Sequence, residues 1–170
     1  EHRAVDQPGA RAVGQGVVGI DAEGAWNKPH GDSRPVIAIV DTGVTGHADL
    51  APSLLPGYNF VSDPDRAGNG VGRSADATDL GDWVDETDLQ NPKYAGCNTS
   101  NSSWHGTHVA GIAAAAGNNG TGISGVSQNA MILPVRVLGK CGGYLTDAAA
   151  GILWAAGLPV AGVPSNPNPA

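Results

Sequence analysis

The chain has 170 residues, 41% of them hydrophobic, so it is long and apolar enough to bury the core of one domain. Its formal net charge is −7 with only nine Lys and Arg residues, which argues against the basic patch that nucleic-acid binding requires. No apolar run approaches the roughly 20 residues of a membrane span, and no basic start followed by an apolar core marks a signal peptide. We therefore expect no nucleic-acid or membrane partner, and we expect any secretion leader to have been removed.

The pattern of apolar and turn-forming residues divides the chain into three parts. Residues 1–34 lack clear periodicity and are expected to form an irregular arm, with a short helix at Ala22–Trp26. Residues 35–160 hold the strongly apolar segments and should form the body of the domain. Residues 161–170 are rich in Pro, which cannot continue a helix, so we expect an exposed end that suits proteolytic nicking.

Within residues 35–160 the expected strands and helices alternate. The first is a strand at 36–40, which is followed directly by Asp41. In chain order there follow a strand at 58–61, a helix at 104–116, a strand at 130–138 and a helix at 145–156. The helix at 104–116 is almost wholly small and apolar after His108, so we expect it to be buried. This alternation predicts an α/β fold, a three-layer sandwich with a largely parallel central sheet flanked by helices.

Two short motifs place polar groups in apolar surroundings. Asp41–Gly43 puts an acid at the carboxyl end of a buried strand, the edge of a parallel sheet where catalytic groups collect. His105–Gly111 opens the helix at 104–116. Burying its polar side chains would cost free energy, so their presence there indicates a function. A metal site at His105 and His108 would lack the neighbouring acid of zinc-binding helices. We therefore expect His108 to be a buried, hydrogen-bonded structural residue.

These two motifs, in this order, resemble the aspartate and histidine boxes of the subtilisin family of serine proteases, the subtilases, and the likeness extends over roughly residues 35–160. The pattern is similar to that of extracellular subtilases of Gram-negative bacteria. The resemblance implies a secreted endopeptidase that hydrolyses polypeptides through an acyl-enzyme at neutral to alkaline pH. His105 would be the general base, and Asp41 would orient its imidazole.

The resemblance also implies a calcium site after the histidine helix. Asp49 occupies the position of a calcium carboxylate in the family, and the loop 117–123 matches the calcium loop of the family. Asn119 would give a side-chain oxygen, and carbonyl oxygens would come from Gly117, Thr121 and Ile123. Gln7 is a candidate for one further ligand. The alternative is a Gly and Asn helix terminator with no metal.

The catalytic Asp and His are 64 residues apart, which is long for compact subtilases, and the surplus lies in residues 62–103, called here the acidic loop. Half of the 16 acidic residues lie between Asp63 and Asp88. Hard cations such as Ca²⁺ prefer such oxygen ligands, so a second calcium ion is one interpretation and a solvated loop is the other. The candidate ligands are Asp63, Asp65, Asn69, Asp76, Asp79 and Asp82.

A third segment resembles the strand on which subtilases bind extended substrates. It comprises Gly142, Gly143 and Tyr144, and glycines allow the close backbone approach that strand pairing needs. The alternative is a plain turn. Cys141 lies beside this segment and Cys97 lies in the acidic loop. In a secreted enzyme they would form a disulfide that ties the loop to the rim of the cleft.

The sequence lacks the Gly-Thr-Ser-Met-Ala type of box that carries the nucleophile of a subtilase. Its serines at 124, 127 and 165 lack that context, and the oxyanion-hole asparagine is also missing. We therefore expect the partner to be the carboxy-terminal half of the same protease, either nicked from this chain or missing from it. The alternative is a non-catalytic, calcium-stabilised binding module built on the subtilase scaffold.

Overall fold

A computed structural model of the chain describes residues 19–28 and 33–170. Its described strands form one parallel sheet in the order β1-β3-β2, with β1 at Val36–Asp41, β3 at Met131–Arg136 and β2 at Tyr58–Asn59. The register pairs Val36 with Met131 and Asp41 with Arg136. All three strands therefore end at the same edge of the sheet.

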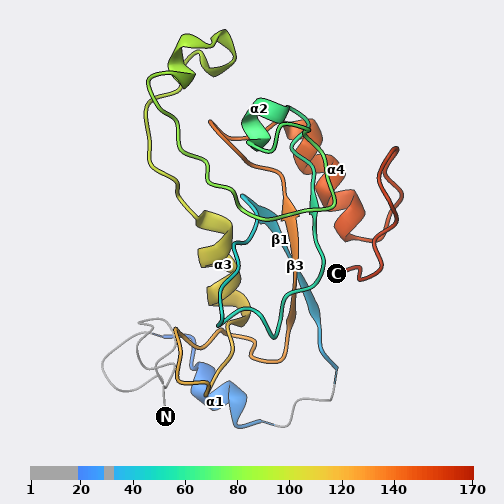
Figure 1. The fold of residues 1–170 in the computed structure, drawn as a ribbon. Helices are drawn as coiled ribbons and strands as arrows, with labels where there is room; N and C mark the ends of the chain where they lie inside the picture. Colours follow the sequence, from blue (N-terminus) through green and yellow to red (C-terminus); the bar gives the residue numbers. More distant parts are fainter. Residues whose placement is uncertain (1–18, 29–32) are drawn as a thin grey trace.

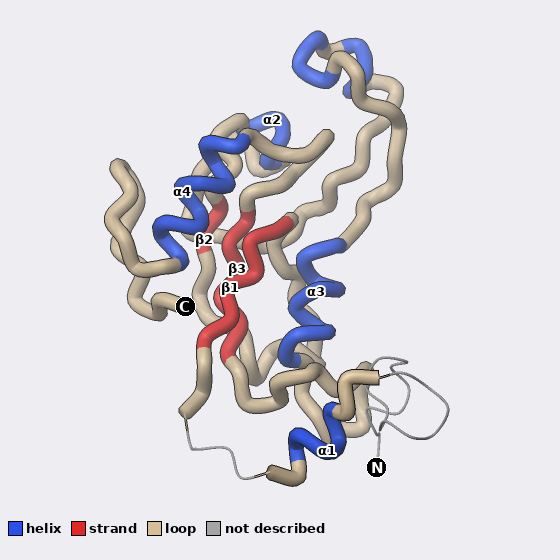
Figure 2. The backbone as a smooth tube through the Cα atoms, turned by 180° about the vertical axis from the view of Figure 1, so that it is seen from behind, coloured by secondary structure: helices blue, strands red, loops and turns tan. Residues whose placement is uncertain are grey.

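Two helices lie on opposite faces of this sheet (Figure 1). Helix α3 (His105–Ala114) packs on the face formed by Ile39 and Ile132, whereas α4 (Leu145–Ala155) packs on the face formed by Leu133 and Val135. Successive residues of β1 point to opposite faces, as the two-residue period of a strand requires. Seen from behind, the helix, sheet and helix layers are the same (Figure 2), and the predicted α/β sandwich is confirmed.

The expected elements are present, with ends that differ by a few residues. Helix α1 (Ala22–Trp26) has the predicted bounds, and the Trp26 indole donates to the carbonyl of Val126 at 2.8 Å. The strand expected at 58–61 ends at Asn59. Beyond it the Phe60 N–H still donates to the carbonyl of Arg136 at 2.7 Å, and the Val61 N–H donates to the Asn59 side-chain oxygen at 3.1 Å. A short helix α2 (Pro64–Ala67) and 3-10 turns η2 (Asp88–Gln90) and η3 (Pro92–Tyr94) were not predicted.

The expected full burial of the helix at 104–116 is wrong. Only one face of α3 is buried, through Gly106, Ala110 and Ala114, while Ile112 is 40% exposed. Within the described residues, α3 meets the sheet with a single face. His108 lies on the open side and is exposed, which contradicts its expected burial.

The last residues fold back onto the end of α4. The Trp154 indole donates to the carbonyl of Pro164 at 2.7 Å, and the Ala170 N–H donates to the carbonyl of Ala155 at 2.9 Å. Residues 161–170 are largely exposed, as expected, and these two hydrogen bonds hold them against the end of α4. In the described part of the chain, no helix is long and apolar enough to cross a membrane.

Candidate active site

Asp41 is the last residue of β1 and is 9% exposed. Its Oδ1 accepts the backbone N–H of Thr42 at 2.7 Å, which fixes the carboxylate at the sheet edge where the parallel strands end. This edge is where open α/β sheets collect their functional groups. The strand thus presents a partly desolvated, oriented acid.

His105 is the first residue of α3, and its ring meets the Asp41 carboxylate. The Nδ1 atom lies 2.9 Å from Oδ1 and 2.7 Å from Oδ2 of Asp41. An ionised carboxylate can only accept, so Nδ1 carries the shared proton and Nε2 is the nitrogen left to act as a base. The His105 side chain is 60% exposed, so its ring can reach a group brought from outside the described residues.

Two glycines allow this contact between helix and strand. A Cβ at Gly106 would collide with the carbonyl oxygen of Gly43 and would lie 3.2 Å from the Cβ of Asp41. Gly43 has a φ of 97°, a conformation that other residues avoid, and a Cβ there would lie 2.5 Å from the carbonyl oxygen of Ala77. The glycines of both motifs therefore serve the close packing that joins Asp41 to His105.

A buried hydroxyl beneath this pair was not singled out from the sequence. Thr42 is 4% exposed, and its Oγ1 accepts the N–H of Gly106 at 2.9 Å while donating to Oδ2 of Asp79 at 2.7 Å. Asp79 was expected to bind calcium, but the structure places it under the active-site pair. The signal that could have found Thr42 is its position inside the Asp41–Gly43 motif.

The acidic residues nominated for a second calcium ion do not converge on one site. Among the described residues, no group of three or more His, Cys, Asp or Glu side chains is arranged to hold a metal ion. Asp63 caps α2, and both it and Asp65 contact the Lys93 ammonium. Asp76 accepts from Thr78. The carboxylates are therefore distributed: Asp63 and Asp65 share Lys93, Asp76 stabilises its own turn, and Asp79 accepts from Thr42.

The expected first calcium loop does gather around Asp49, which is 3% exposed. Asn119 Nδ2 donates to Oδ1 of Asp49 at 2.7 Å, and the N–H of Ile123 donates to Oδ2 at 2.9 Å. A Cβ at Gly122 would collide with the same carboxylate, so only glycine allows the loop to wrap it. Among the described residues, the carbonyls of Gly117, Thr121 and Ile123 accept no hydrogen bond. Asn119 faces Asp49 with its Nδ2, and its Oδ1 accepts the N–H of Thr121 at 3.0 Å, so the side-chain oxygen expected from Asn119 is turned away from Asp49. The Asp49 carboxylate and the three carbonyls are oxygens of the kind that Ca²⁺ prefers, and Gln7 lies outside the described residues.

The candidate substrate segment forms the open end of a small turn after β3. Gly139 and Gly142 exchange two backbone hydrogen bonds of 3.0 Å, and Gly142 has a φ of 85°. Gly142, Gly143 and Tyr144 are exposed. In the part of the chain that the structure describes, no hydrogen bond is made by the N–H or carbonyl of Gly143 or by the N–H of Tyr144.

A disulfide joins this turn to the acidic loop, between Cys97 and Cys141. Polar contacts reinforce the connection. Lys140 Nζ lies 2.7 Å from Oδ2 of Asp88, and Arg66 donates to the carbonyls of Lys140, Cys141 and Lys93 at 3.1, 2.9 and 2.8 Å. The Arg66 guanidinium also lies over the rings of Tyr94 and Tyr144. The candidate substrate segment is thus fastened to the acidic loop.

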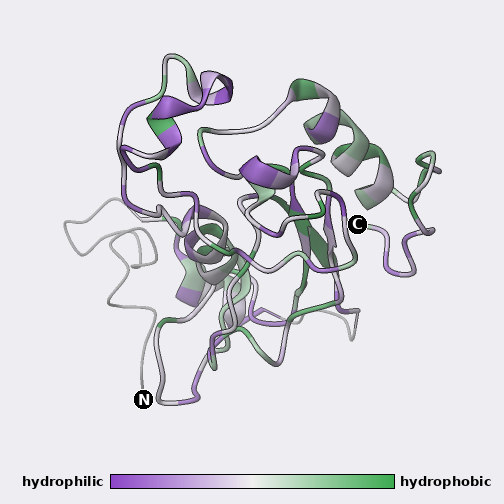
Figure 3. Ribbon diagram, turned by 45° about the horizontal axis from the view of Figure 1, so that its top comes forward, coloured by the Kyte–Doolittle hydropathy of each residue, from purple (hydrophilic) through white to green (hydrophobic). Residues whose placement is uncertain are grey.

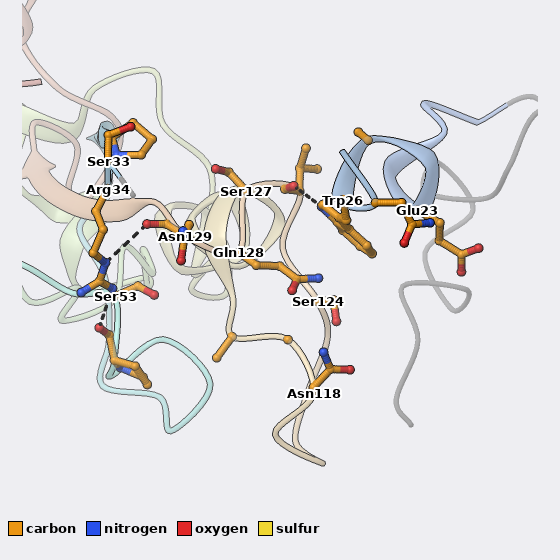
Figure 4. A pocket seen from close by; sticks show the side chains of 17 residues that line it. Glu23, Trp26, Ser33, Arg34, Ser53, Asn118, Ser124, Ser127, Gln128 and Asn129 are labelled. Carbon is orange, nitrogen blue, oxygen red and sulfur yellow. Dashed lines mark hydrogen bonds between the residues drawn. The ribbon is translucent and has the colours of Figure 1, made fainter. Parts of the chain in front are cut away.

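A hollow of about 910 Å³ lies near the amino-terminal end of β1, away from Asp41 (Figure 4). Arg34 borders it and donates to the carbonyls of Asn129 and Pro52 at 3.5 Å. Trp26 and Gln128 also line it. Asp41 and His105 lie outside this hollow, so the candidate active site is the surface at the carboxyl edge of the sheet.

Comparison with known proteins agrees with this geometry. The Subtilase family model matches residues 32–168. An extracellular protease of Xanthomonas campestris is 49% identical over 94% of the chain, and an extracellular basic protease of Dichelobacter nodosus is 43% identical over 91% of it. A solved protease structure from Pseudoalteromonas arctica is 46% identical, with a TM-score of 0.84 over 96% of this chain and 46% of that chain.

The chain belongs to the subtilase family. The predicted similarity to extracellular subtilases of Gram-negative bacteria is confirmed by these relatives. The chain spans only 27% and 26% of the length of the two curated relatives.

Proposed function

We propose that this chain is the amino-terminal part of the catalytic domain of a secreted serine endopeptidase, with Asp41 and His105 as two members of its triad. The observation that carries the proposal is the contact of His105 Nδ1 with the buried carboxylate of Asp41. This arrangement fixes the tautomer in which Nε2 is free to accept a proton. The extracellular relatives and the disulfide support secretion.

In the proposed reaction, Nε2 of His105 takes the hydroxyl proton of a serine as the serine oxygen attacks the substrate carbonyl. Asp41 stabilises the imidazolium that forms. The C–N bond then breaks, the leaving amine receives that proton, and an acyl-enzyme remains for water to hydrolyse by the reverse roles. The serine and the oxyanion asparagine would lie on the carboxy-terminal part of the same protease, which is the proposed partner.

Polypeptide substrates would bind along Gly142, Gly143 and Tyr144. The backbone groups of Gly143 are exposed and have no partner among the described residues, so they are available to an added strand. The disulfide and Arg66 hold this turn in place, which reduces the entropy lost when the substrate binds. We propose that backbone pairing, rather than side-chain contact, is the contribution of this segment.

We further propose that Asp49, Asn119 and the carbonyls of Gly117, Thr121 and Ile123 hold a Ca²⁺ ion. The ion would neutralise a buried carboxylate and rigidify the loop that follows α3. The Asp49 carbonyl already accepts the N–H of Ala116 at 2.9 Å, so the site and the end of the helix are coupled. Chelation should lower the unfolding temperature of the full-length protein, and Asp49→Asn should abolish that dependence; an unfolding temperature unaffected by chelation would refute the site.

A fluorophosphonate probe tests the proposed activity, because it labels only a serine that a base activates. The full-length protein should be labelled on one serine outside the 170 residues, as found by peptide mapping. Asp41→Asn should reduce peptide hydrolysis by about 10⁴-fold, because it favours the wrong imidazole tautomer. A folded full-length protein that neither reacts with the probe nor cleaves peptides would overturn the proposal and favour a binding module.

A further inference from the structure

Helix α3 begins without a capping side chain of its own. Trp104, the residue before the helix, has a φ of 51° and makes no side-chain capping bond. The first N–H groups of a helix have no acceptor within the helix, so others must supply one. Ser103 Oγ lies 3.3 Å from the His105 N–H, and Thr42 Oγ1, on the strand side, accepts the Gly106 N–H at 2.9 Å.

The two partners of the Thr42 hydroxyl determine its direction. A backbone N–H can only donate and an ionised carboxylate can only accept. The single hydroxyl proton of Thr42 therefore goes to Asp79 Oδ2, 2.7 Å away, and a lone pair faces Gly106. Without the acceptor at Asp79 the Thr42 hydroxyl would lose the bond that fixes its position, and its hold on the Gly106 N–H would weaken.

Asp79 is itself held in a fixed position. It is 3% exposed, and its Oδ1 accepts the N–H of Gly81 at 2.8 Å. Arg136, which is 1% exposed, donates to the carbonyl of Thr42 at 3.0 Å. Burial lowers the pKa of the Arg136 guanidinium, and the carboxylates of Asp79, Asp76 and Asp82 oppose this. The network beneath the active site thus combines a buried cation with an acid from the acidic loop.

We propose that Asp79 is a positioning residue: through the Thr42 hydroxyl it fixes the first turn of α3 against β1 and so holds His105 at Asp41. The hydrogen bonds of Asp79 go to Thr42 and Gly81, and none goes to His105 or to the candidate substrate segment. The base of the acidic loop is therefore a structural part of the active site. The catalytic consequence rests on the proposed function, whereas the structural consequence at Gly106 does not.

The test uses the full-length protein with Asp79→Ala, Thr42→Val and the double variant. Each single variant should lower kcat about tenfold to a hundredfold and leave KM nearly unchanged, because a small misplacement of a catalytic group is costly. The double variant should be no worse than either single variant, since both remove the same connection. Thr42→Ser keeps the hydroxyl and should restore most of the activity. Asp79→Asn keeps one accepting oxygen where Asp79 uses two, for Thr42 and for Gly81, so its activity should lie between those of Asp79→Ala and the wild type.

Asp85→Asn is the matched control, because Asp85 is an exposed acid of the same loop that also accepts backbone N–H groups. It should leave kcat unchanged. An Asp79→Ala variant with wild-type kcat, or losses that add in the double variant, would overturn the proposal. Circular dichroism shows whether Asp79→Ala folds. If it does not, the kcat values of Asp79→Asn and Thr42→Val test the proposal in its place.

Hydrogen exchange separates this inference from the proposed function. In Asp79→Ala the Gly106 amide should exchange faster than in the wild type, while the Gly111 amide, in the middle of α3, should keep its protection. This readout needs no peptidase activity, so it remains valid if the fluorophosphonate experiment fails. Unchanged protection at Gly106 would refute the capping role even in an active enzyme.

Discussion

The Asp41–His105 pair and the tip of the acidic loop, residues 85–97, are held in different ways. The pair depends on backbone packing: a parallel sheet, a helix over it, and glycines that let the two approach. The tip stands away from the sheet and from α3 and α4 (Figure 1), and its helical turns are mostly hydrophilic (Figure 3). It is attached by a disulfide, the Lys140–Asp88 pair and the contacts of Arg66. Disturbing the first region should affect chemistry, and disturbing the second should affect stability and substrate binding.

The largest effect on kcat should come from adding a methyl group at position 106. Gly106→Ala would collide with the carbonyl of Gly43 and displace His105 from Asp41. We expect kcat to fall by about 100-fold or more in the full-length protein. Gly111→Ala is the matched control in the same helix, because its Cβ would meet only Ile123 Cδ1 at 3.7 Å. Equal activity of the two variants would show that Gly106 does not control the approach of helix and strand.

Loss of the disulfide should affect the tip and spare the chemistry. Cys97 and Cys141 are 44 residues apart in sequence, so their bond restricts a long loop in the unfolded chain. The double variant Cys97→Ser/Cys141→Ser should lose about 2–4 kcal/mol of unfolding free energy by denaturant titration. Its KM for extended peptides should rise while kcat changes little. A large fall in kcat with unchanged stability would contradict the separation of the two regions.

Arg66 should have a smaller effect of the same kind. Arg66→Met removes the donors to the carbonyls of Lys93, Lys140 and Cys141, and such bonds from a charged group are worth about 1.5–3 kcal/mol. We expect a lower thermal midpoint and a higher KM for extended peptides. Arg66→Lys should restore part of the stability, because one ammonium cannot reach all three carbonyls. A KM unchanged in both variants would show that the turn keeps its geometry without Arg66.

The smallest effect should be the pH dependence of the Lys140–Asp88 pair. The hydrogen bond from Lys140 lowers the pKa of Asp88, so this carboxylate contributes stability above its unfolded pKa of about 3.9. The contribution should disappear as the pH falls through the lowered pKa, loosening the tip in acid. Asp88→Asn should remove this part of the acid dependence of thermal unfolding, by about 0–1 kcal/mol. An identical pH profile in wild type and variant would show that the pair contributes nothing.

Local sequence signals determined much of the fold. Alternation of apolar strands and helices predicted the order of β1, β3, α3 and α4, and the Asp41–Gly43 and His105–Gly111 motifs predicted the family. These signals are reliable because a buried strand and a helix each impose a period on their own residues. They also predicted that Asp41 would lie at the carboxyl edge of the sheet.

The partners of polar side chains were decided only by the tertiary structure. The sequence placed Asp79 with Asp63 and Asp76 in one acidic group, yet the fold uses Asp79 beneath Thr42 and the others in separate turns. His108 was expected inside and is exposed in the described part of the chain, where only one face of α3 is covered. A carboxylate can satisfy its lone pairs with any nearby donor. Which donor is near depends on how distant segments pack, and no local pattern records that.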